Sequence, residues 1–208
     1  MSAAANVLNT GLAAMGLEVG PEAQARLLAY AALMLKWNRI YNLTAVRDEI
    51  SIVQLHLLDS LAVLPFLKGK SLADIGSGGG LPGIPLAIVR PDLAVTLVES
   101  NQKKSAFQRQ AAIELGLSNL RPVCMRVEQL EGSYDIVTSR AFSDLADFVS
   151  LSSHLLAPGG VLAAMKGVYP AEEIARLPSG FHVEQSIPLD VPGVEGQRHL
   201  ILITEAPR

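Results

Sequence analysis

The spacing of hydrophobic positions changes near residue 68, and this change predicts two structural regions. Before that point, apolar residues recur every three or four positions, which is typical of helices with one buried face. The helices expected there span residues 3–17, 21–40 and 48–67. After it, short apolar runs alternate with helical segments, as in sheets whose parallel strands are joined by helices. We therefore expect a helical extension over residues 1–67, packed on an α/β domain over residues 68–208.

The second region contains seven candidate strands. They are short apolar runs at residues 72–75, 94–98, 121–125, 135–138, 161–165, 181–189 and 199–204. Helices are expected between most of them, at residues 84–89, 102–115, 145–156 and 172–177, with Pro158 to Gly160 closing the third. A Gly/Pro loop without a helix joins the last two strands, which predicts a terminal antiparallel hairpin on a mostly parallel sheet. The predicted fold is α/β, with a doubly wound, Rossmann-like sheet.

Composition is consistent with one packed domain and no metal site. Half of the 208 residues are hydrophobic and 18% are charged. No apolar run is as long as a membrane span, and the N-terminus lacks the basic and apolar segments of a secretory signal. The single cysteine, Cys124, excludes an internal disulfide and a multi-cysteine metal site. It fits a reducing cytoplasm, and we expect it to be a small buried residue within a strand.

The most informative stretch is the glycine-rich segment between the first predicted strand and the next helix. Its glycines are Gly76, Gly78, Gly79, Gly80 and Gly83. A strand, a glycine turn and a helix in this order are typical of nucleotide and nucleoside sites in doubly wound sheets. Glycine suits such a site because a backbone without Cβ atoms can turn sharply and approach a ligand closely.

Two classes of ligand fit this segment. Read from Gly78, it satisfies the dinucleotide pattern G-x-G-x-x-G. Read from Gly76, with Asp74 two positions earlier, it resembles the loop of methyltransferases that use S-adenosylmethionine. Glu99 ends the next strand about 20 residues later, where an acid can accept hydrogen bonds from the ribose diol of either ligand. The terminal hairpin and the absence of a Tyr-x-x-x-Lys pair disfavour an NAD-dependent oxidoreductase. A non-enzymatic RNA-binding or assembly factor is the third alternative.

Further segments, spread over most of the chain, carry a more specific resemblance. They are Trp37-Asn38, Asn42 to Thr44, His56 to Ser60, Asp74 to Pro85, Arg126 to Glu128, Ser139 to Phe142, Pro158 to Gly160 and Met165 to Gly167. Together they resemble the bacterial methyltransferase family first named glucose-inhibited division protein B. The resemblance implies a class I methyltransferase fold and methylation of N7 of a guanine in 16S ribosomal RNA, free or in the small ribosomal subunit or its precursor.

The residues and the resemblance together predict a site for S-adenosylmethionine. Asp74 and the loop backbone would hold its amino-acid end, Glu99 its ribose, and Val127 with Glu128 its adenine edge. A solvated acid at a helix start explains Glu128 equally well. The resemblance adds Leu81 and Arg140. The full predicted set is Asp74, Gly76, Ser77, Gly78, Gly80, Leu81, Glu99, Val127, Glu128 and Arg140.

The chemistry expected of this site is methyl transfer without a general base, because guanine N7 already exposes an unprotonated lone pair. The fourth strand ends in Thr138-Ser139-Arg140-Ala141 rather than the Asn/Asp-Pro-Pro-aromatic motif of enzymes that methylate exocyclic amines. Arg140 is the best candidate for a catalytic, orienting side chain. It lies at the carboxyl edge of the sheet, where it can contact a carboxylate, a phosphate or guanine O6. The alternative is a surface ion pair with Asp135 or Asp144.

RNA contacts must come from local basic patches, because the net charge of −3 argues against broad binding of nucleic acid. The candidates are Lys36, Arg39, Arg47, Lys103, Lys104 and Lys166, for which solvated side chains are the alternative.

His56 and Asp59 stand three positions apart and share a helix face. With no serine or cysteine nucleophile nearby, we favour a hydrogen-bonded pair that joins the two regions over a catalytic pair. We expect the protein to be a monomer that binds neither membranes nor metals.

Overall fold

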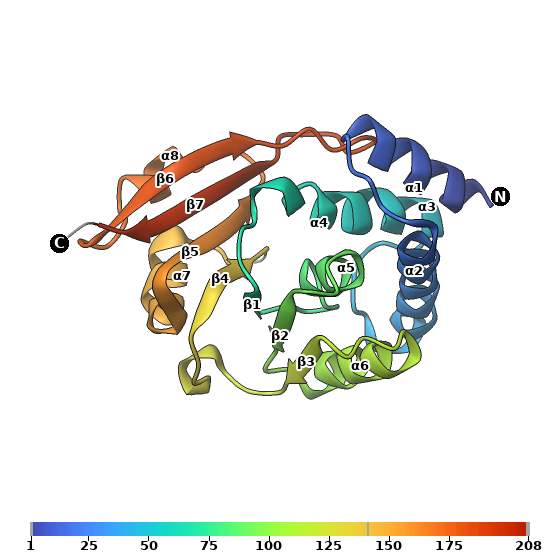
Figure 1. Ribbon diagram of the computed structural model, residues 1–208, viewed down its shortest axis with the longest axis horizontal. Helices are drawn as coiled ribbons and strands as arrows, with labels where there is room; N and C mark the ends of the chain where they lie inside the picture. The colour runs from blue at the N-terminus through green and yellow to red at the C-terminus, as the bar shows by residue number, and fades with distance from the viewer. Residues whose placement is uncertain (1, 141, 207–208) are drawn as a thin grey trace.

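The computed structural model describes residues 2–140 and 142–206. Within these ranges, seven strands form one sheet in the order β3-β2-β1-β4-β5-β7-β6 (Figure 1). Neighbouring strands from β3 to β5 are parallel, and β7 runs antiparallel to both β5 and β6. The strands are β1 (Ser71–Ile75), β2 (Ala94–Val98), β3 (Leu120–Val123), β4 (Tyr134–Ser139), β5 (Leu156–Lys166), β6 (Phe181–Pro188) and β7 (His199–Glu205). The predicted seven-stranded sheet with a terminal hairpin is confirmed.

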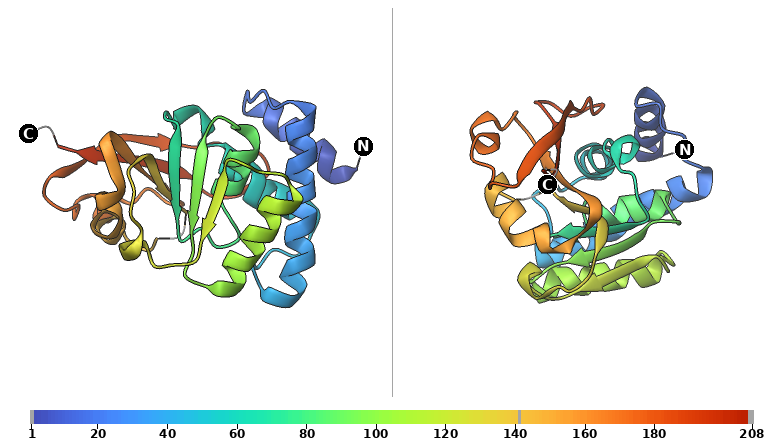
Figure 2. Two further views of the ribbon diagram at one scale, coloured as in Figure 1. Left: turned by 60° about the horizontal axis from the view of Figure 1, so that its bottom comes forward. Right: turned by 60° about the vertical axis from the view of Figure 1, so that its left-hand side comes forward.

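Two hydrophobic clusters cover the two faces of the sheet. Successive side chains of a strand point to opposite faces, so Leu72 and Ile136 belong to one cluster while Ala73 and Val137 belong to the other. The first cluster also contains α5 (Gly83–Val89), α6 (Gln102–Glu114) and the N-terminal helices, and the second contains α7 (Leu145–Ser152) (Figure 2). The short α8 (Ala171–Ile174) follows β5. Burial on both faces explains why the parallel strands are continuous apolar runs.

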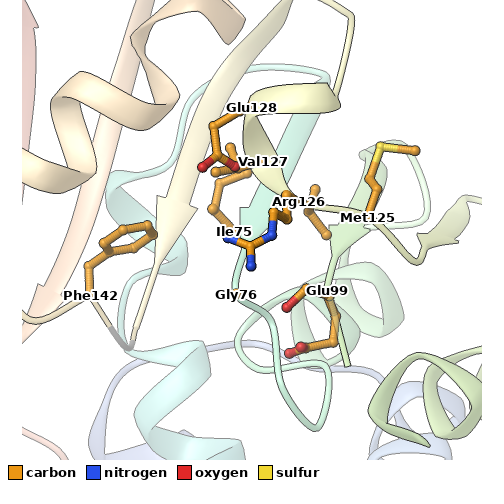
Figure 3. A pocket seen from close by; sticks show the side chains of 10 residues that line it. Ile75, Gly76, Glu99, Met125, Arg126, Val127, Glu128 and Phe142 are labelled. Atoms are coloured by element: carbon orange, nitrogen blue, oxygen red, sulfur yellow. The ribbon is translucent and has the colours of Figure 1, made fainter. Parts of the chain in front are cut away.

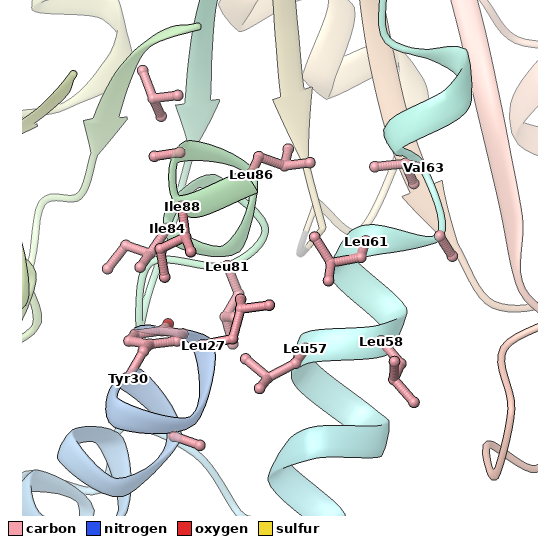
Figure 4. Packing of buried hydrophobic residues seen from close by; sticks show 14 of the residues in the cluster. Leu27, Tyr30, Leu57, Leu58, Leu61, Val63, Leu81, Ile84, Leu86 and Ile88 are labelled. Atoms are coloured by element: carbon pink, nitrogen blue, oxygen red, sulfur yellow. The ribbon is translucent and has the colours of Figure 1, made fainter. Parts of the chain in front are cut away.

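The N-terminal helices share the core of the sheet domain. They are α1 (Ala3–Ala14), α2 (Pro21–Tyr41) and a run made of α3 (Glu49–Ile52), the π-helix η1 (Val53–Leu58), α4 (Asp59–Leu61) and the 3₁₀ turn η2 (Leu64–Phe66). Figure 4 shows Leu57 and Leu61 of this run facing α5, and Leu27 and Tyr30 of α2 approaching the same helix. Side chains of these helices and of the sheet form one hydrophobic cluster. The division of the chain at residue 67 stays a prediction.

The run over residues 48–67 differs from the single regular helix that its periodicity predicts. Asp48 caps its start by accepting a hydrogen bond from the Ser51 N–H. Six residues are π-helical, and the last turn is 3₁₀ and contains Pro65, which lacks the N–H needed to continue a helix. By length and composition, Glu49–Phe66 could cross a membrane, contrary to expectation. However, 56% of its 18-residue window is buried inside the protein, and its apolar side chains pack in the core.

The sequence predicts that Pro158 to Gly160 closes a helix. This prediction is wrong, because the segment lies within β5. The helix ends at Ser152, and β5 already pairs with β4 at Leu156. The pairing register shifts between Tyr134 and Ile136 of β4, which marks a bulge. Glycine fits at position 160 because a Cβ there would lie 2.9 Å from the backbone oxygens of Ala157 and Tyr134.

Cys124 is exposed, so the prediction of a small buried residue within a strand is wrong. The third strand ends at Val123, one residue before it. Its thiol lies 3.8 Å from the carbonyl oxygen of Ser100.

Candidate functional site

The loop between β1 and α5 lies at the carboxyl edge of the sheet and is tied to the neighbouring strand. The N–H groups of Gly76 and Ser77 both donate to the carbonyl oxygen of Val98, at 2.9 and 3.2 Å. Gly76, Gly78 and Gly80 have φ angles of +66°, +56° and +88°. Only glycine adopts these conformations without strain, so the glycine pattern is explained by the backbone of the loop.

Two helices hold this loop from beneath. Gln108 of α6 donates through Nε2 to Ser77 Oγ at 2.9 Å and to the Gly78 carbonyl at 2.8 Å. Tyr30 of α2 donates its hydroxyl to the Gly79 carbonyl, and burial raises the pKa of Tyr30 well above its usual range. Neither residue was predicted. The available signal was a polar side chain on the otherwise apolar face of each helix.

Asp74 lies beneath the loop rather than at its surface. It is fully buried, and its Oδ2 accepts a hydrogen bond of 2.8 Å from the Gly83 N–H. Burial raises the pKa of Asp74 to about 7, while the Gly83 N–H and the charge of Arg140 lower it and Glu99 raises it. The residue therefore shapes the start of α5. Its predicted contact with the amino-acid end of a cofactor has no support in its position.

Gly83 permits the close approach of α5 to β1 and β2. A Cβ at this position would overlap Leu97 and lie 2.9 Å from the Asp74 Oδ2. We expect Gly83→Ala to lower the free energy of unfolding by about 1–3 kcal/mol, because the surrounding core is fully packed. Denaturant unfolding measures this. Gly20→Ala is the matched control, since a Cβ there meets nothing within 4 Å, and it should cost less than about 1 kcal/mol. Equal effects of the two changes would contradict this account of Gly83.

A cavity of about 180 Å³ opens beside the loop, between the ends of β1 and β2 and the 3₁₀ turn η3 (Val127–Gln129) (Figure 3). It is lined by Ile75, Gly76, Val98, Glu99, Ser100, Met125, Arg126, Val127, Glu128 and Phe142. Glu99 is held in place by two backbone donors: its Oε2 accepts from the Gly78 N–H at 2.9 Å and its Oε1 from the Asn101 N–H at 2.8 Å. The carboxylate is thus fixed at one wall of the cavity.

The walls of this cavity fit a nucleoside. A Cβ added to Gly76 would stand in open space, with no atom within 4 Å, so glycine leaves room at the wall where a ligand would lie. Glu99 offers acceptors for ribose hydroxyls, and Val127 and Glu128 offer an apolar surface and a carboxylate for a base. The structure therefore brings together Gly76, Glu99, Val127 and Glu128 of the predicted set. Met125, Arg126 and Phe142 line the cavity without having been assigned to it from the sequence.

The remaining predicted residues lie elsewhere. Ser77 and Leu81 are buried within the loop, and neither lines this cavity. Gly78 and Gly80 shape the backbone of the loop. Their contact with a cofactor stays a prediction.

Arg140 lines a second, larger cavity, of about 420 Å³. Its Nη1 donates to Asp59 Oδ2 and to the Leu55 carbonyl, both at 3.3 Å. The alternative that the sequence left for Arg140, a surface ion pair with Asp135 or Asp144, is therefore wrong. Asp135 accepts from the Lys70 and Ser71 N–H groups, and Asp144 pairs with Arg176. Ala141 of the same segment lies outside the described residues.

Asp59 joins the two regions, but it does not form the expected pair with His56. His56 Nε2 lies 2.7 Å from Thr44 Oγ1. Asp59 is bound by Arg140 and, at 3.1 Å, by Nε of Arg198. Burial and the neighbouring charge of Arg140 lower the pKa of His56 to about 4, against raising contributions from the Leu55 carbonyl and Asp59. The imidazole is therefore neutral at neutral pH.

His56 and Asp74 give opposite pH dependences of stability. Between about pH 4 and 6.5, the unfolded chain binds a proton at His56 that the native protein lacks, so this group lowers stability as the pH falls. Between about pH 4 and 7, native Asp74 keeps a proton that the unfolded chain has lost, so this group lowers stability as the pH rises. The two contributions oppose each other in the wild type.

Single variants should separate these two slopes. Relative to the wild type, His56→Gln should lose stability as the pH rises from about 4 to 6.5, and Asp74→Asn as it falls from about 7 to 4. Each change should be on the order of 3 kcal/mol across its window. Denaturant unfolding at several pH values measures both. Slopes of the same sign in the two variants would contradict the assignment.

The basic residues predicted to contact RNA fall into separate groups. Arg39 and Arg47 line a shallow cavity of about 280 Å³ with Asn42 at the end of α2, and Lys36 is exposed on the same helix. Lys103 and Lys104 lie in the first turn of α6. Lys166 is 12% exposed and pairs with Glu173 at 2.7 Å, so it is neither a solvated lysine nor fully free to meet a phosphate. In the described parts of the chain, no group of three or more His, Cys, Asp or Glu side chains could hold a metal ion.

Comparisons with solved structures show the fold. TrmN from Thermus thermophilus superposes with a TM-score of 0.59 at 20% identity, covering 81% of this chain and 53% of that one. A SAM-dependent methyltransferase from Aquifex aeolicus gives 0.59 at 16% identity, covering 75% and 93%. The fold is that of class I methyltransferases that use S-adenosylmethionine, as the resemblance implied.

Comparisons of sequence show the family. Ribosomal RNA small subunit methyltransferase G of Aromatoleum aromaticum is 59% identical, over 98% of this chain and 99% of its own length. The protein of the same name from Neisseria gonorrhoeae is 55% identical, over 95% and 97%. The family model GidB, described as rRNA small subunit methyltransferase G, matches residues 23–201. The chain therefore belongs to the GidB family of small-subunit ribosomal RNA methyltransferases.

Proposed function

We propose that this protein transfers a methyl group from S-adenosylmethionine to N7 of a guanine in 16S ribosomal RNA. The observation that carries the proposal is the placement of two cavities beside the end of β4 in a member of this family. One presents Gly76 and Glu99 to a nucleoside, and the other presents Arg140 and Asp59. Since Phe142 lines the first cavity and Arg140, two residues earlier, lines the second, a cofactor in the first and a base in the second would be neighbours.

The residues of the first cavity would bind and orient the cofactor. Glu99 would accept hydrogen bonds from the ribose hydroxyls, and Val127 and Glu128 would contact the adenine. When bound, S-adenosylmethionine would supply a methyl group on a positively charged sulfur. As the lone pair of N7 forms the new N–C bond, the C–S bond would break in line, and its electron pair would stay on the sulfur of S-adenosylhomocysteine. The protein needs to hold the two reactants in line and exclude water.

Proton removal is not required of this site, because N7 of guanine carries no proton. Arg140 would orient the substrate. Its guanidinium is fixed by Asp59 and the Leu55 carbonyl and so is held in one place before substrate arrives. An arginine held in this way can donate to guanine O6 or to a phosphate.

Membership of the methyltransferase family excludes the two alternative functions that the sequence left open. An NAD-dependent oxidoreductase and a non-enzymatic RNA-binding factor are both wrong for a member of a methyltransferase family whose model covers residues 23–201. We further propose that the enzyme is a cytoplasmic monomer that acts on 16S ribosomal RNA, with Lys36, Arg39, Arg47, Lys103 and Lys104 on the RNA-binding surface.

Mass mapping of 16S ribosomal RNA from a strain lacking the gene tests the proposal. We expect one N7-methylguanine to be missing and to return when the wild-type gene is restored. An unchanged set of modified guanines would overturn the target, and loss of a methyl group at another atom would overturn the chemistry.

A further inference from the structure

The second cavity is built from segments that are distant in the sequence. Thr44 to Val46, the η1 and α4 helices, the end of β5 and the start of β7 all contribute to it. Arg140 lines this cavity, and Phe142, two residues later, lines the cofactor cavity. A group held in the second cavity is therefore next to the place where the methyl group is expected.

At one wall of this cavity, the Asp59 carboxylate is clamped between two arginines. Oδ2 accepts from Arg140 Nη1 at 3.3 Å and Oδ1 from Arg198 Nε at 3.1 Å, while the side chain is only 7% exposed. A carboxylate has about four acceptor positions. Each oxygen of Asp59 thus keeps capacity for a further donor from a molecule in the cavity.

Guanine is the base whose donors match such a carboxylate. Its Watson–Crick edge presents N1–H and the N2 amino group side by side, and enzymes that act on an extruded base read this edge by hydrogen bonds. Adenine has an acceptor at N1, which would face the carboxylate unfavourably. Methylation at N7 makes the guanine ring positively charged, and a negative group at the opposite edge stabilises that charge as it develops.

The charges around the cavity suit a nucleotide rather than a free base. The single negative charge of Asp59 balances one of the two positive charges of Arg140 and Arg198. The remaining positive charge is available to bind a phosphate. Lys166, also in the lining, is balanced by Glu173 at 2.7 Å. His56 adds no charge at neutral pH, because burial and Arg140 lower its pKa to about 4.

Exposed rings stand beside the same cavity. His199 lines it, and the ring of Tyr169 contacts His199 edge-on with centroids 5.7 Å apart. Tyr169 is 47% exposed and its neighbour Val168 is 74% exposed. Aromatic rings in such positions stack on the unpaired bases of single-stranded RNA.

From this geometry we propose that the cavity between Asp59, Arg140 and Arg198 receives the target nucleotide, and that Asp59 selects guanine by accepting hydrogen bonds from N1–H and the N2 amino group. The inference rests on the proposed function and adds the residue that determines which base is accepted.

The test compares guanine with inosine at the target position of small subunits reconstituted with synthetic ribosomal RNA. Inosine keeps N7 and N1–H but lacks the N2 amino group. We expect kcat/KM of the wild type to fall about tenfold or more with inosine, as for loss of one hydrogen bond to a charged group. Asp59→Asn should be slower on guanine and should discriminate less than about threefold between the two bases. A purely structural role of Asp59 would lower both rates and leave their ratio unchanged.

Asp92→Asn is the matched control, because Asp92 is an exposed carboxylate that pairs with Arg90. It should keep the wild-type ratio. Equal use of guanine and inosine by the wild type would overturn the inference, and this result does not depend on the folding of any variant. Absence of N7 methylation of guanine by the wild type would instead overturn the proposed function itself.

Discussion

Replacing Glu99 by alanine is expected to weaken the binding of S-adenosylmethionine about 100-fold. In the proposed complex, the carboxylate accepts both ribose hydroxyls, and it also accepts the Gly78 and Asn101 N–H groups that position the loop. Loss of hydrogen bonds to a charged group amounts to about 3 kcal/mol here, or two factors of ten in affinity. Isothermal titration calorimetry with the cofactor measures the change.

Glu114→Ala provides the control for this experiment. Glu114 is exposed at the end of α6 and bonds to Gln110, so its removal should leave the affinity within about twofold. Wild-type affinity in Glu99→Ala would show that the cofactor does not lie against β2. Binding of NADH instead of S-adenosylmethionine by the wild type would contradict the cofactor assignment.

Replacing Arg140 by alanine should lower kcat/KM for methyl transfer about 100-fold or more while the protein remains folded. The change removes a preorganised cation beside the reacting base. Removing a preorganised group that stabilises a transition state lowers the rate of other enzymes by about this factor. Asp59 would still be paired with Arg198, so we expect the free energy of unfolding to fall by only about 1–2 kcal/mol. Methyl transfer to small subunits from the deletion strain, together with denaturant unfolding, measures both quantities.

The control is Arg176→Ala, because the Arg176 side chain is 63% exposed and pairs with Asp144. It should change stability by less than about 1 kcal/mol and leave kcat/KM unchanged. Near-normal methylation by Arg140→Ala would contradict its orienting role. A 100-fold loss of cofactor affinity with unchanged turnover of the bound complex would place Arg140 in the cofactor site instead.

Local patterns predicted the sheet and the loop between β1 and α5, beside which the first cavity lies. Buried parallel strands are continuous apolar runs, and the left-handed turns of the loop require glycine, so both leave a direct record in the sequence. Glu99, Val127 and Glu128 line one cavity because they follow strands, and the carboxyl ends of neighbouring parallel strands meet at one edge. Their contact with a cofactor stays a prediction.

Contacts between distant segments could not be predicted in this way. Arg140 is 81 positions from Asp59, and no local pattern connects them. Sequence neighbours such as Asp144 were the obvious partners, and they were the wrong ones. Gln108 and Tyr30 were missed for the same reason, since their hydrogen bonds to the loop exist only once α6 and α2 have packed beneath it.

Short-range irregularities were the other source of error. The bulge at Pro158 to Gly160 has the residues of a helix-ending turn, although here they continue β5 after a shift in register. Likewise, an apolar run through Cys124 predicts a strand that ends two residues later than the one observed. In both cases, hydrogen bonding to the neighbouring strand, rather than the local sequence, determines where the strand begins or ends.

The most direct test of the account is a crystal structure of the protein with S-adenosylmethionine. We predict density in the cavity between Gly76, Glu99 and Glu128, with the ribose hydroxyls on the Glu99 carboxylate and the adenine beside Val127. Density in the cavity of Asp59 and Arg198, or anywhere away from the β1–α5 loop, would contradict the central claim.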